Sequence, residues 1–143
     1  MAYVAVDEPV TDYRTQWSGV RPKNLVGAPS FREVQRTIAG LVDGKLLVGH
    51  ALKNDLDALM LEHPRSMLRD TARYRPLKNG KRPASLKVLT KKFLEEDIQG
   101  GEHSSVVDAR AALGVYLKHR AEWEMSLAGK GGKALNVPQG RPK

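Results

Sequence analysis

Two segments of the sequence place carboxylates and histidines near the ends of expected helices. In residues 48–59 (VGHALKNDLDAL), a strand end and a tight Gly-His turn lead into a helix whose first turn holds Asp55. In residues 102–116 (EHSSVVDARAALGVY), His103 lies in the loop before the last helix and Asp108 just over one turn inside it. Mg²⁺ and Mn²⁺ prefer oxygen ligands, and two such ions about 3.5–4 Å apart can stabilise the attacking and leaving oxygens of a phosphodiester. A histidine on a loop can take the proton of the attacking water, so the pattern is compatible with metal-dependent hydrolysis.

Each of these residues also has a simpler interpretation. Asp55 and Asp108 can each act as a favourable partner for the positive N-terminal end of its own helix. His103 can be an ordinary loop residue, and His50 a structural residue of the turn. Asp57 is expected to face solvent. The small residues after Asp108, which are Ala109, Ala111 and Ala112, would let the helix approach a neighbouring element closely.

The elements that must position these side chains alternate between strands and helices. Ser30 and Glu33 have the spacing of a capping box and predict a helix that ends at Gly44. Asn54 and Ser85 are expected to cap two further helices. The remaining expected elements are a strand at 3–6, an irregular connection at 9–29, strands at 45–50 and 66–70, a loop at 97–103 and a long helix at about 104–127 carrying Ala109, Ala112, Leu113, Tyr116 and Leu117. This alternation predicts an α/β layered fold.

Composition limits the classes of protein to which the chain can belong. Its 143 residues suffice for one domain, which we assign to residues 1–128, followed by a disordered basic tail at 129–143. The absence of cysteine excludes disulfides and thiolate metal sites. No apolar run approaches the roughly 20 residues of a membrane-spanning helix, and the first residues lack the features of a secretory signal. We therefore expect an intracellular protein without a membrane partner, of undetermined oligomeric state.

The positive charge of the chain is concentrated in one region. The formal net charge is +8, and residues 65–92 contain ten basic residues and a single acid, Asp70. Proline and glycine interrupt the stretch RYRPLKNGKRP, which favours a loop that binds phosphates over an amphipathic membrane helix. The expected nucleic-acid contacts are Arg73, Arg75, Lys78, Lys81 and Arg82. A merely solvated loop, or a loop that docks an acidic protein, is the alternative.

In combination, these segments resemble the DEDDh class of 3′→5′ exonucleases. VGHALKNDLDAL resembles the second motif of that class, and HSSVVD, with its H-x₄-D pattern, resembles the third. Within the class the chain is similar to the RNA exonuclease 4 branch, which is kin to the interferon-stimulated 20 kDa exonuclease. Residues 8–25 (EPVTDYRTQWSGVRPKNL), 69–71 (RDT) and 82–94 (RPASLKVLTKKFL) also resemble that branch, so five separated blocks occur in the family's order.

The resemblance implies a ribonuclease H-like fold, a mixed sheet flanked by helices, and the removal of nucleotides from the 3′ ends of RNA or sometimes DNA. By position, it implies that Asp55 and Asp108 are metal ligands of a site for two Mg²⁺ or Mn²⁺ ions and that His103 is the general base. It also implies RNA rather than DNA as the partner, a role in ribosomal RNA processing and a location in the nucleus, in the nucleolus.

The first motif of the class, a D-x-E on a central strand, has no counterpart in this sequence. Asp7 and Glu8 cannot replace it, because adjacent residues of a strand point to opposite faces and because Glu8 falls on another block of the family. We therefore expect the C-terminal part of an exonuclease domain, which reflects a truncated gene model, a fragment or a natural non-catalytic derivative. Without the D-x-E carboxylates this chain could be inactive and bind RNA only, or serve as a structural partner, and its apolar sheet edge would be exposed.

Overall fold

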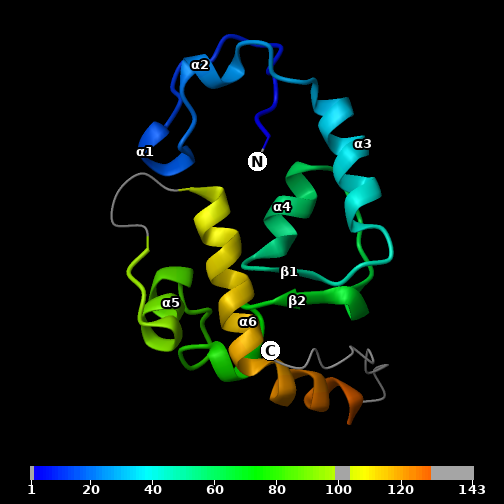
Figure 1. Ribbon diagram of the computed structural model, residues 1–143, viewed down its shortest axis with the longest axis vertical. Helices are drawn as coiled ribbons and strands as arrows, with labels where there is room; N and C mark the ends of the chain where they lie inside the picture. Colours follow the sequence, from blue (N-terminus) through cyan, green and yellow to red (C-terminus); the bar gives the residue numbers. More distant parts are fainter. Residues whose placement is uncertain (1, 99–103, 130–143) are drawn as a thin grey trace, which may run out of the picture.

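The computed structural model describes residues 2–98 and 104–129, and Figure 1 shows their arrangement. Two short helices, α1 (Thr15–Ser18) and α2 (Pro22–Leu25), precede the longer helix α3 (Phe31–Val42). The strands β1 (Leu47–Gly49) and β2 (Leu68–Asp70) are joined by helix α4 (Leu52–Ala58) and the 3₁₀ turn η1 (Arg65–Met67). The 3₁₀ turn η2 (Arg75–Leu77) then leads to α5 (Leu86–Leu94) and α6 (Ser105–Ala128).

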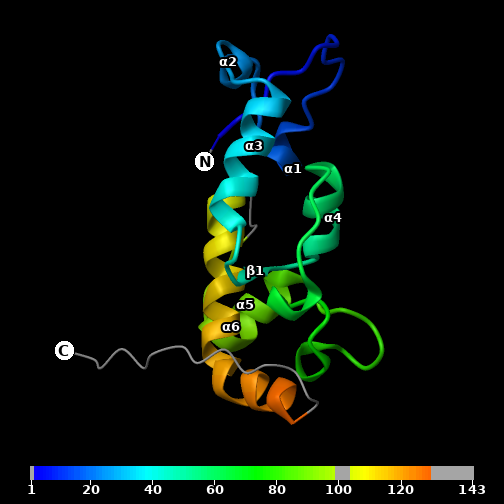
Figure 2. The ribbon, with the colours of Figure 1, turned by 90° about the vertical axis from the view of Figure 1, so that its right-hand side faces the viewer.

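The strands form a two-stranded parallel sheet in which Leu47, Val48 and Gly49 are paired with Leu68, Arg69 and Asp70. Because β1 and β2 are parallel and joined through α4, the three elements make a β-α-β unit, as the expected α/β layering requires. Figure 2 shows α3 and α6 on one side of the molecule and α4 on the other. Within the described residues, the second edge of β1 has no strand beside it.

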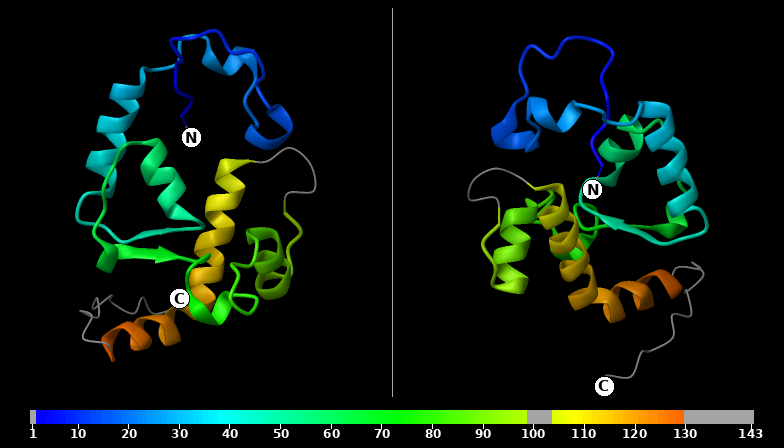
Figure 3. Two further views of the ribbon diagram at one scale, coloured as in Figure 1. Left: turned by 180° about the vertical axis from the view of Figure 1, so that it is seen from behind. Right: turned by 45° about the horizontal axis from the view of Figure 1, so that its top comes forward.

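The hydrophobic core lies between the sheet and the pair formed by α5 and α6. Its buried members are Leu77, Leu89, Val115, Tyr116 and Trp123, and a second cluster joins Leu86, Ile98, Ala111 and Ala112. Figure 3 shows from behind that α1 and α2 lie at the end of the molecule away from this core. Several large apolar side chains of α6, such as Leu113 and Leu117, remain exposed. Within the described residues, no helix has the length and apolar character needed to cross a bilayer.

Helix caps made by residues close in sequence agree with expectation. The Ser30 hydroxyl accepts a hydrogen bond from the backbone N–H of Glu33, and the Glu33 carboxylate accepts one from the N–H of Ser30 at 2.8 Å. The Ser85 hydroxyl caps α5 by accepting from the N–H of Val88 at 3.3 Å. The strand expected at 66–70 and the long helix expected at about 104–127 are also present.

Three expectations about local structure are wrong. Helix α4 begins at Leu52 after Ala51, which has a left-handed backbone (φ 59°), so Asn54 lies inside the helix instead of capping it. The expected irregular connection at 9–29 contains α1 and α2. The expected strand at 3–6 does not form, because no strand within the described residues lies beside it. The backbone N–H of Ala5 donates one hydrogen bond to the Pro29 carbonyl oxygen.

Replacing Ser85 by alanine is expected to lower the free energy of unfolding by about 1 kcal/mol, because it leaves the Val88 N–H without its cap. Urea denaturation followed by circular dichroism measures the change. Ser104→Ala is the matched control, because Ser104 occupies the N-cap of α6 but makes no side-chain cap bond in the described part of the chain. Equal losses in the two variants would contradict the assignment.

Candidate functional site

The carboxyl ends of β1 and β2 meet at one edge of the sheet, where Gly49 is paired with Asp70. Asp70 is 8% exposed, and its carboxylate accepts three backbone hydrogen bonds. The donors are Ala51 N–H at 2.8 Å, Leu52 N–H at 3.2 Å and Ala72 N–H at 2.9 Å. A side chain from the second strand therefore caps the helix that follows the first strand, and it fixes where α4 begins.

The turn between β1 and α4 requires close packing. A Cβ atom at Gly49 would clash with Cδ2 of Leu52, so any larger residue here would require the Leu52 side chain to move. The Thr71 hydroxyl donates to the Gly49 carbonyl oxygen at 3.1 Å, and its oxygen lies 2.9 Å from Nδ1 of His50. Burial lowers the pKa of His50, although the negative charges of Asp70 and Asp108 partly oppose that shift. His50 is thus held as a neutral residue of the turn, in agreement with its simpler interpretation.

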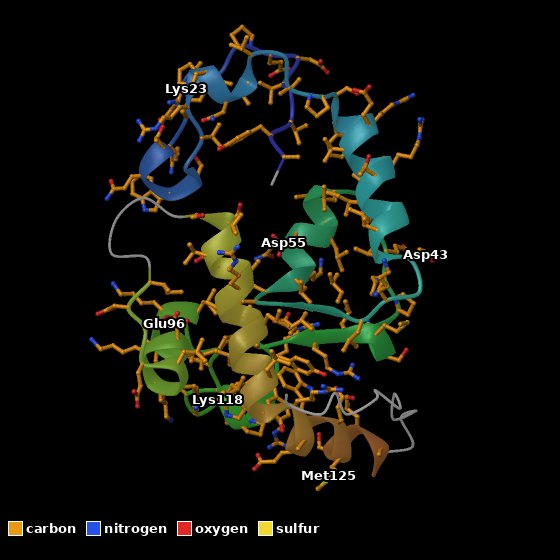
Figure 4. The ribbon with its side chains drawn as sticks, viewed as in Figure 1. Lys23, Asp43, Asp55, Glu96, Lys118 and Met125 are labelled. Atoms are coloured by element: carbon orange, nitrogen blue, oxygen red, sulfur yellow. The ribbon has the colours of Figure 1, made fainter. Side chains whose placement is uncertain are left out.

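The fixed position of α4 directs Asp55 into a cavity of about 570 Å³ that Asp108 also lines. Asp55 belongs to the first turn of α4, and Asp108 to the first turn of α6. Figure 4 shows Asp55 on the side of α4 that faces α6. The structure therefore brings together two side chains that lie far apart in the sequence. The cavity is otherwise largely apolar, with His50, Ser105 and Ser85 among its polar lining residues.

The surroundings of Asp55 disfavour its charged form. Burial, followed by repulsion from Asp70, raises the pKa of Asp55 above its ordinary value. Asp57, two positions further along α4, is exposed, which confirms the expected solvent-facing position. Its carboxylate forms an ion pair with Lys53. The two acids of this helix therefore have different environments, and only Asp55 lines the cavity with Asp108.

The carboxyls of Asp55 and Asp108 supply part of what a divalent-metal site needs. They offer oxygen donors, the type that Mg²⁺ and Mn²⁺ prefer, from two separate helices. In residues 2–98 and 104–129, however, no group of three or more acidic or histidine side chains gathers in a way that could hold a metal ion. Two carboxylates alone do not complete a site for two ions. The oxygen ligands among the described residues are therefore too few to bind both ions.

The Asp55→Asn variant is expected to gain stability relative to the unmodified chain as the pH rises from 4 to 7 in metal-free buffer. An unfolded aspartate has a pKa of about 3.9, whereas the pKa of folded Asp55 is higher. Between these values the folded state binds more protons than the unfolded state, so the contribution of Asp55 to stability is lost as the pH rises through the folded pKa. Urea denaturation at several pH values tests this. A gain that is independent of pH, or equal in the control Asp57→Asn, would contradict it.

Of the remaining predicted residues, those that the structure describes do not line this cavity. His103 lies outside the described residues, as does nearly all of the expected tail at 129–143. Arg73 and Arg75 line a second cavity of about 790 Å³. Lys81 and Arg82 are exposed at a turn closed by the bridge between Asn79 and Arg82, and Lys78 is half-buried. Neither cavity lining includes these last three, so the five basic residues do not form one surface there.

Asp70 is a positioning residue that is absent from the predicted site residues, since in the sequence it stands out only as the single acid of a basic stretch and as part of the RDT block. The available signal is its place as the last residue of the second strand of a β-α-β unit, within the RDT block. Carboxyl ends of parallel strands lie at one edge of a sheet, so an acid there can reach the start of the preceding helix. The same reasoning extends to Thr71, whose hydroxyl contacts the turn at Gly49 and His50.

The sequence is similar to those of known exonucleases. The sequence profile of the family described as Exonuclease (RNase T) matches residues 1–116. RNA exonuclease 4 of Cryptococcus neoformans is 51% identical over 128 residues, which are 87% of this chain and 31% of that protein. RNA exonuclease 4 of Saccharomyces cerevisiae is 48% identical over 126 residues, which are 85% of this chain and 43% of that protein. The human RNA exonuclease 4 is 46% identical over 125 residues, 85% of this chain and 29% of that protein.

Parts of Pan2 are among the solved structures with a similar fold. The catalytic unit of Neurospora crassa Pan2 superposes with a TM-score of 0.75 at 28% identity, covering 95% of this chain and 24% of that chain. The Saccharomyces cerevisiae Pan2 pseudoubiquitin hydrolase-RNA exonuclease module, in complex with A7 RNA, gives a TM-score of 0.75 at 33% identity over 90% of this chain and 22% of that chain. This similarity confirms the expected α/β exonuclease fold. The chain spans less than half the length of these curated relatives.

Proposed function

Because the chain belongs to the exonuclease family, we propose that it is part of a 3′→5′ exonuclease that trims RNA, with ribosomal RNA precursors as its substrate. One observation carries the proposal: Asp55 and Asp108, which are far apart in the sequence, line one cavity at the end of the sheet. The RNA in the complex with the similar Saccharomyces cerevisiae Pan2 module supports RNA over DNA.

In this proposal Asp55 and Asp108 would hold Mg²⁺ or Mn²⁺ together with further carboxylates, and His103 would take the proton from the attacking water. Such ions, when bound, would stabilise the attacking and leaving oxygens of the phosphodiester. Asp70 does not touch the substrate; it positions the first turn of α4 through its three backbone hydrogen bonds, and thereby positions Asp55. His50 stays neutral beside Thr71 and keeps the turn closed.

The proposal also includes further carboxylates, a D-x-E pair, because the described residues supply only Asp55 and Asp108 to the cavity. The free edge of β1 within the described residues offers a place for a strand that would carry this pair. We therefore expect the 143-residue chain alone to be inactive. The extended chain, defined as this chain preceded by the segment that precedes the matched region in Cryptococcus neoformans RNA exonuclease 4, should be active.

The test uses a single-stranded RNA labelled at its 5′ end, incubated with Mn²⁺ and either chain. The extended chain is expected to produce a ladder that shortens from the 3′ end, and EDTA should stop it. Internal cleavage, shortening from the 5′ end or equal trimming of DNA would contradict the proposal. RNA binding without hydrolysis by both chains would favour the alternative, a non-catalytic RNA-binding form of the exonuclease fold. Equal hydrolysis by both chains would refute the need for the additional carboxylates.

The resemblance to the RNA exonuclease 4 branch also supports a location in the nucleus, within the nucleolus. Fluorescence microscopy of the tagged protein with a nucleolar marker tests this. Overlap with the marker is expected, and a purely cytoplasmic signal would contradict it.

A further inference from the structure

The second cavity lies across α4 from the one that contains Asp55. We call it the basic groove and define it by α4, residues 61–65, β2, residues 73–76 and the last turns of α6, all of which line it. Lys53 and Asp57 line the basic groove, whereas Asp55 lines the other cavity, because residues two positions apart on a helix face different sides. Leu52 and Leu56 line both cavities, so α4 is the wall between them.

Three arginines that line this groove have no side-chain partner within the described residues. Arg65, Arg73 and Arg75 are exposed, and their guanidinium groups have no hydrogen bond or ion pair to any part of the chain that the structure describes. Of the lining acids, Asp57 is paired with Lys53. The buried carboxylate of Asp70 is occupied by three backbone N–H groups. Three free guanidinium groups therefore share the groove with one remaining carboxylate, that of Glu62.

The segment that carries two of these arginines is held rigidly. Tyr74 stacks on the buried Trp123, with ring centroids 3.9 Å apart and planes 5° from parallel. The backbone N–H groups of Arg73 and Tyr74 both donate to the Asp70 carbonyl oxygen, at 2.9 and 3.1 Å. Arg73 and Arg75, which flank Tyr74, thus project from a fixed frame, so binding through them orders little additional backbone.

We propose that the basic groove binds the phosphates of a single-stranded RNA a few nucleotides upstream of the 3′ end that enters the Asp55 cavity. The inference rests on the proposed function and names a second contact of the same substrate. Planar guanidinium groups suit bidentate contacts with phosphate oxygens, and a positively charged groove is a common way to bind single strands without sequence preference. The linings of the two cavities share Leu52, Leu56 and Leu61. The helix α4 between them is about 10 Å across, so one strand can reach both.

The experiment measures binding of the 143-residue chain to a fluorescein-labelled twelve-nucleotide oligouridine by anisotropy, in EDTA and over a series of salt concentrations. Each neutralised phosphate of a single strand contributes about 0.7 to the salt slope. The triple variant Arg65→Gln, Arg73→Gln and Arg75→Gln is therefore expected to lose about 2 from the slope and about 100-fold in affinity at 0.1 M salt. Arg75→Gln alone should lose about 0.7 and about fivefold, which provides a readout from a single exposed substitution.

The matched control removes the same charge elsewhere, by Lys23→Gln, Arg32→Gln and Arg36→Gln. These exposed residues lie on α2 and α3, and Figure 4 shows Lys23 at the far end of the molecule from Met125, on the turns of α6 beside the groove. The control is expected to keep most of the salt slope. Equal losses in both triple variants, or an unchanged slope in the groove variants, would overturn the proposal.

Two further results distinguish RNA binding in the groove from the binding of an acidic protein and from the nuclease activity. A polyglutamate peptide that displaces the RNA at comparable concentration would overturn it in favour of an acidic protein partner. Because the assay contains no metal, failure of the nuclease activity leaves the binding result intact. Conversely, the groove variants could bind RNA as tightly as the unmodified chain while the extended chain still trims RNA. That result would show that the basic groove does not bind RNA, and it would not affect the proposed function.

Discussion

Replacing Arg69 by methionine is expected to lower the free energy of unfolding by about 3–5 kcal/mol, because it leaves the Glu124 carboxylate without its partner. Arg69 is 1% exposed and donates to both carboxylate oxygens of Glu124, at 2.6 and 2.7 Å. Its remaining nitrogen donates to the carbonyl oxygens of Ser66 and Leu68. The pair ties the centre of β2 to the last turns of α6, and a loss of this size is a large fraction of the stability of a typical domain.

The pH dependence of stability gives a second readout of this pair. The hydrogen bonds from Arg69, assisted by Tyr116, lower the pKa of Glu124, and they outweigh the opposing effect of burial. The stabilisation is therefore fully present above the pKa of an unfolded glutamate, about 4.3, and is lost as the pH falls through the lower folded pKa. Urea denaturation between pH 2 and 7 should show this loss in the unmodified chain and not in the Arg69→Met variant.

Two controls separate the ion pair from general effects of substitution. Arg69→Met combined with Glu124→Leu should recover much of the loss, since replacing both partners of a buried pair by apolar residues is often close to neutral. Lys53→Met breaks the exposed pair with Asp57 and should change the free energy of unfolding by less than about 1 kcal/mol. A loss of under 1 kcal/mol in Arg69→Met itself would show that the pair does not hold β2 to α6.

Replacing Asp108 by asparagine is expected to reduce 3′ trimming by the extended chain more than about 100-fold. Loss of a residue that only orients a metal ligand typically lowers metal affinity or activity 10–100-fold, and removal of a carboxylate ligand itself should exceed that. Asparagine is nearly the same size as aspartate, and Asp108 lies in the first turn of α6, so little change in packing is expected. Initial rates with 5′-labelled RNA measure the effect.

The matched control for this prediction is Asp43→Asn, which removes an equal charge from an exposed residue that lines neither cavity. Its trimming rate should stay within a few-fold of the unmodified chain. If Asp108→Asn keeps more than a tenth of the activity, Asp108 is not a metal ligand. Asp108 would then serve as a favourable partner for the positive N-terminal end of α6.

Local features of the fold could be predicted from the sequence because their causes are local. Ser30 and Ser85 cap helices through the N–H three residues later, and that relation is visible as a spacing. The cap of α4 is different, because its acceptor, Asp70, is 18 positions beyond Leu52. Nothing near Asn54 indicates that the helix starts earlier, so the wrong boundary followed from a contact that only the paired strands create.

In the candidate site too, residues within recognisable motifs could be predicted, whereas a residue whose role depends on strand pairing could not. Asp55 and Asp108 could be named because the motifs around them resemble known ones, and the structure places both on one cavity. Asp70 was missed because its role depends on strand pairing. The sequence predicts that Arg73, Arg75, Lys78, Lys81 and Arg82 contact nucleic acid together. The chain reverses at the Asn79–Arg82 bridge, with Gly80 in the left-handed region (φ 62°), so of these five residues only Arg73 and Arg75 line the basic groove.

Anomalous X-ray diffraction from crystals of the extended chain soaked in MnCl₂ tests whether Asp55 and Asp108 hold the catalytic ions. Anomalous peaks are expected in contact with the carboxylate oxygens of both residues. These peaks should disappear in Asp108→Asn crystals and persist in Asp57→Asn crystals. Manganese bound elsewhere, with both carboxylates free of metal, would show that Asp55 and Asp108 are not the metal ligands.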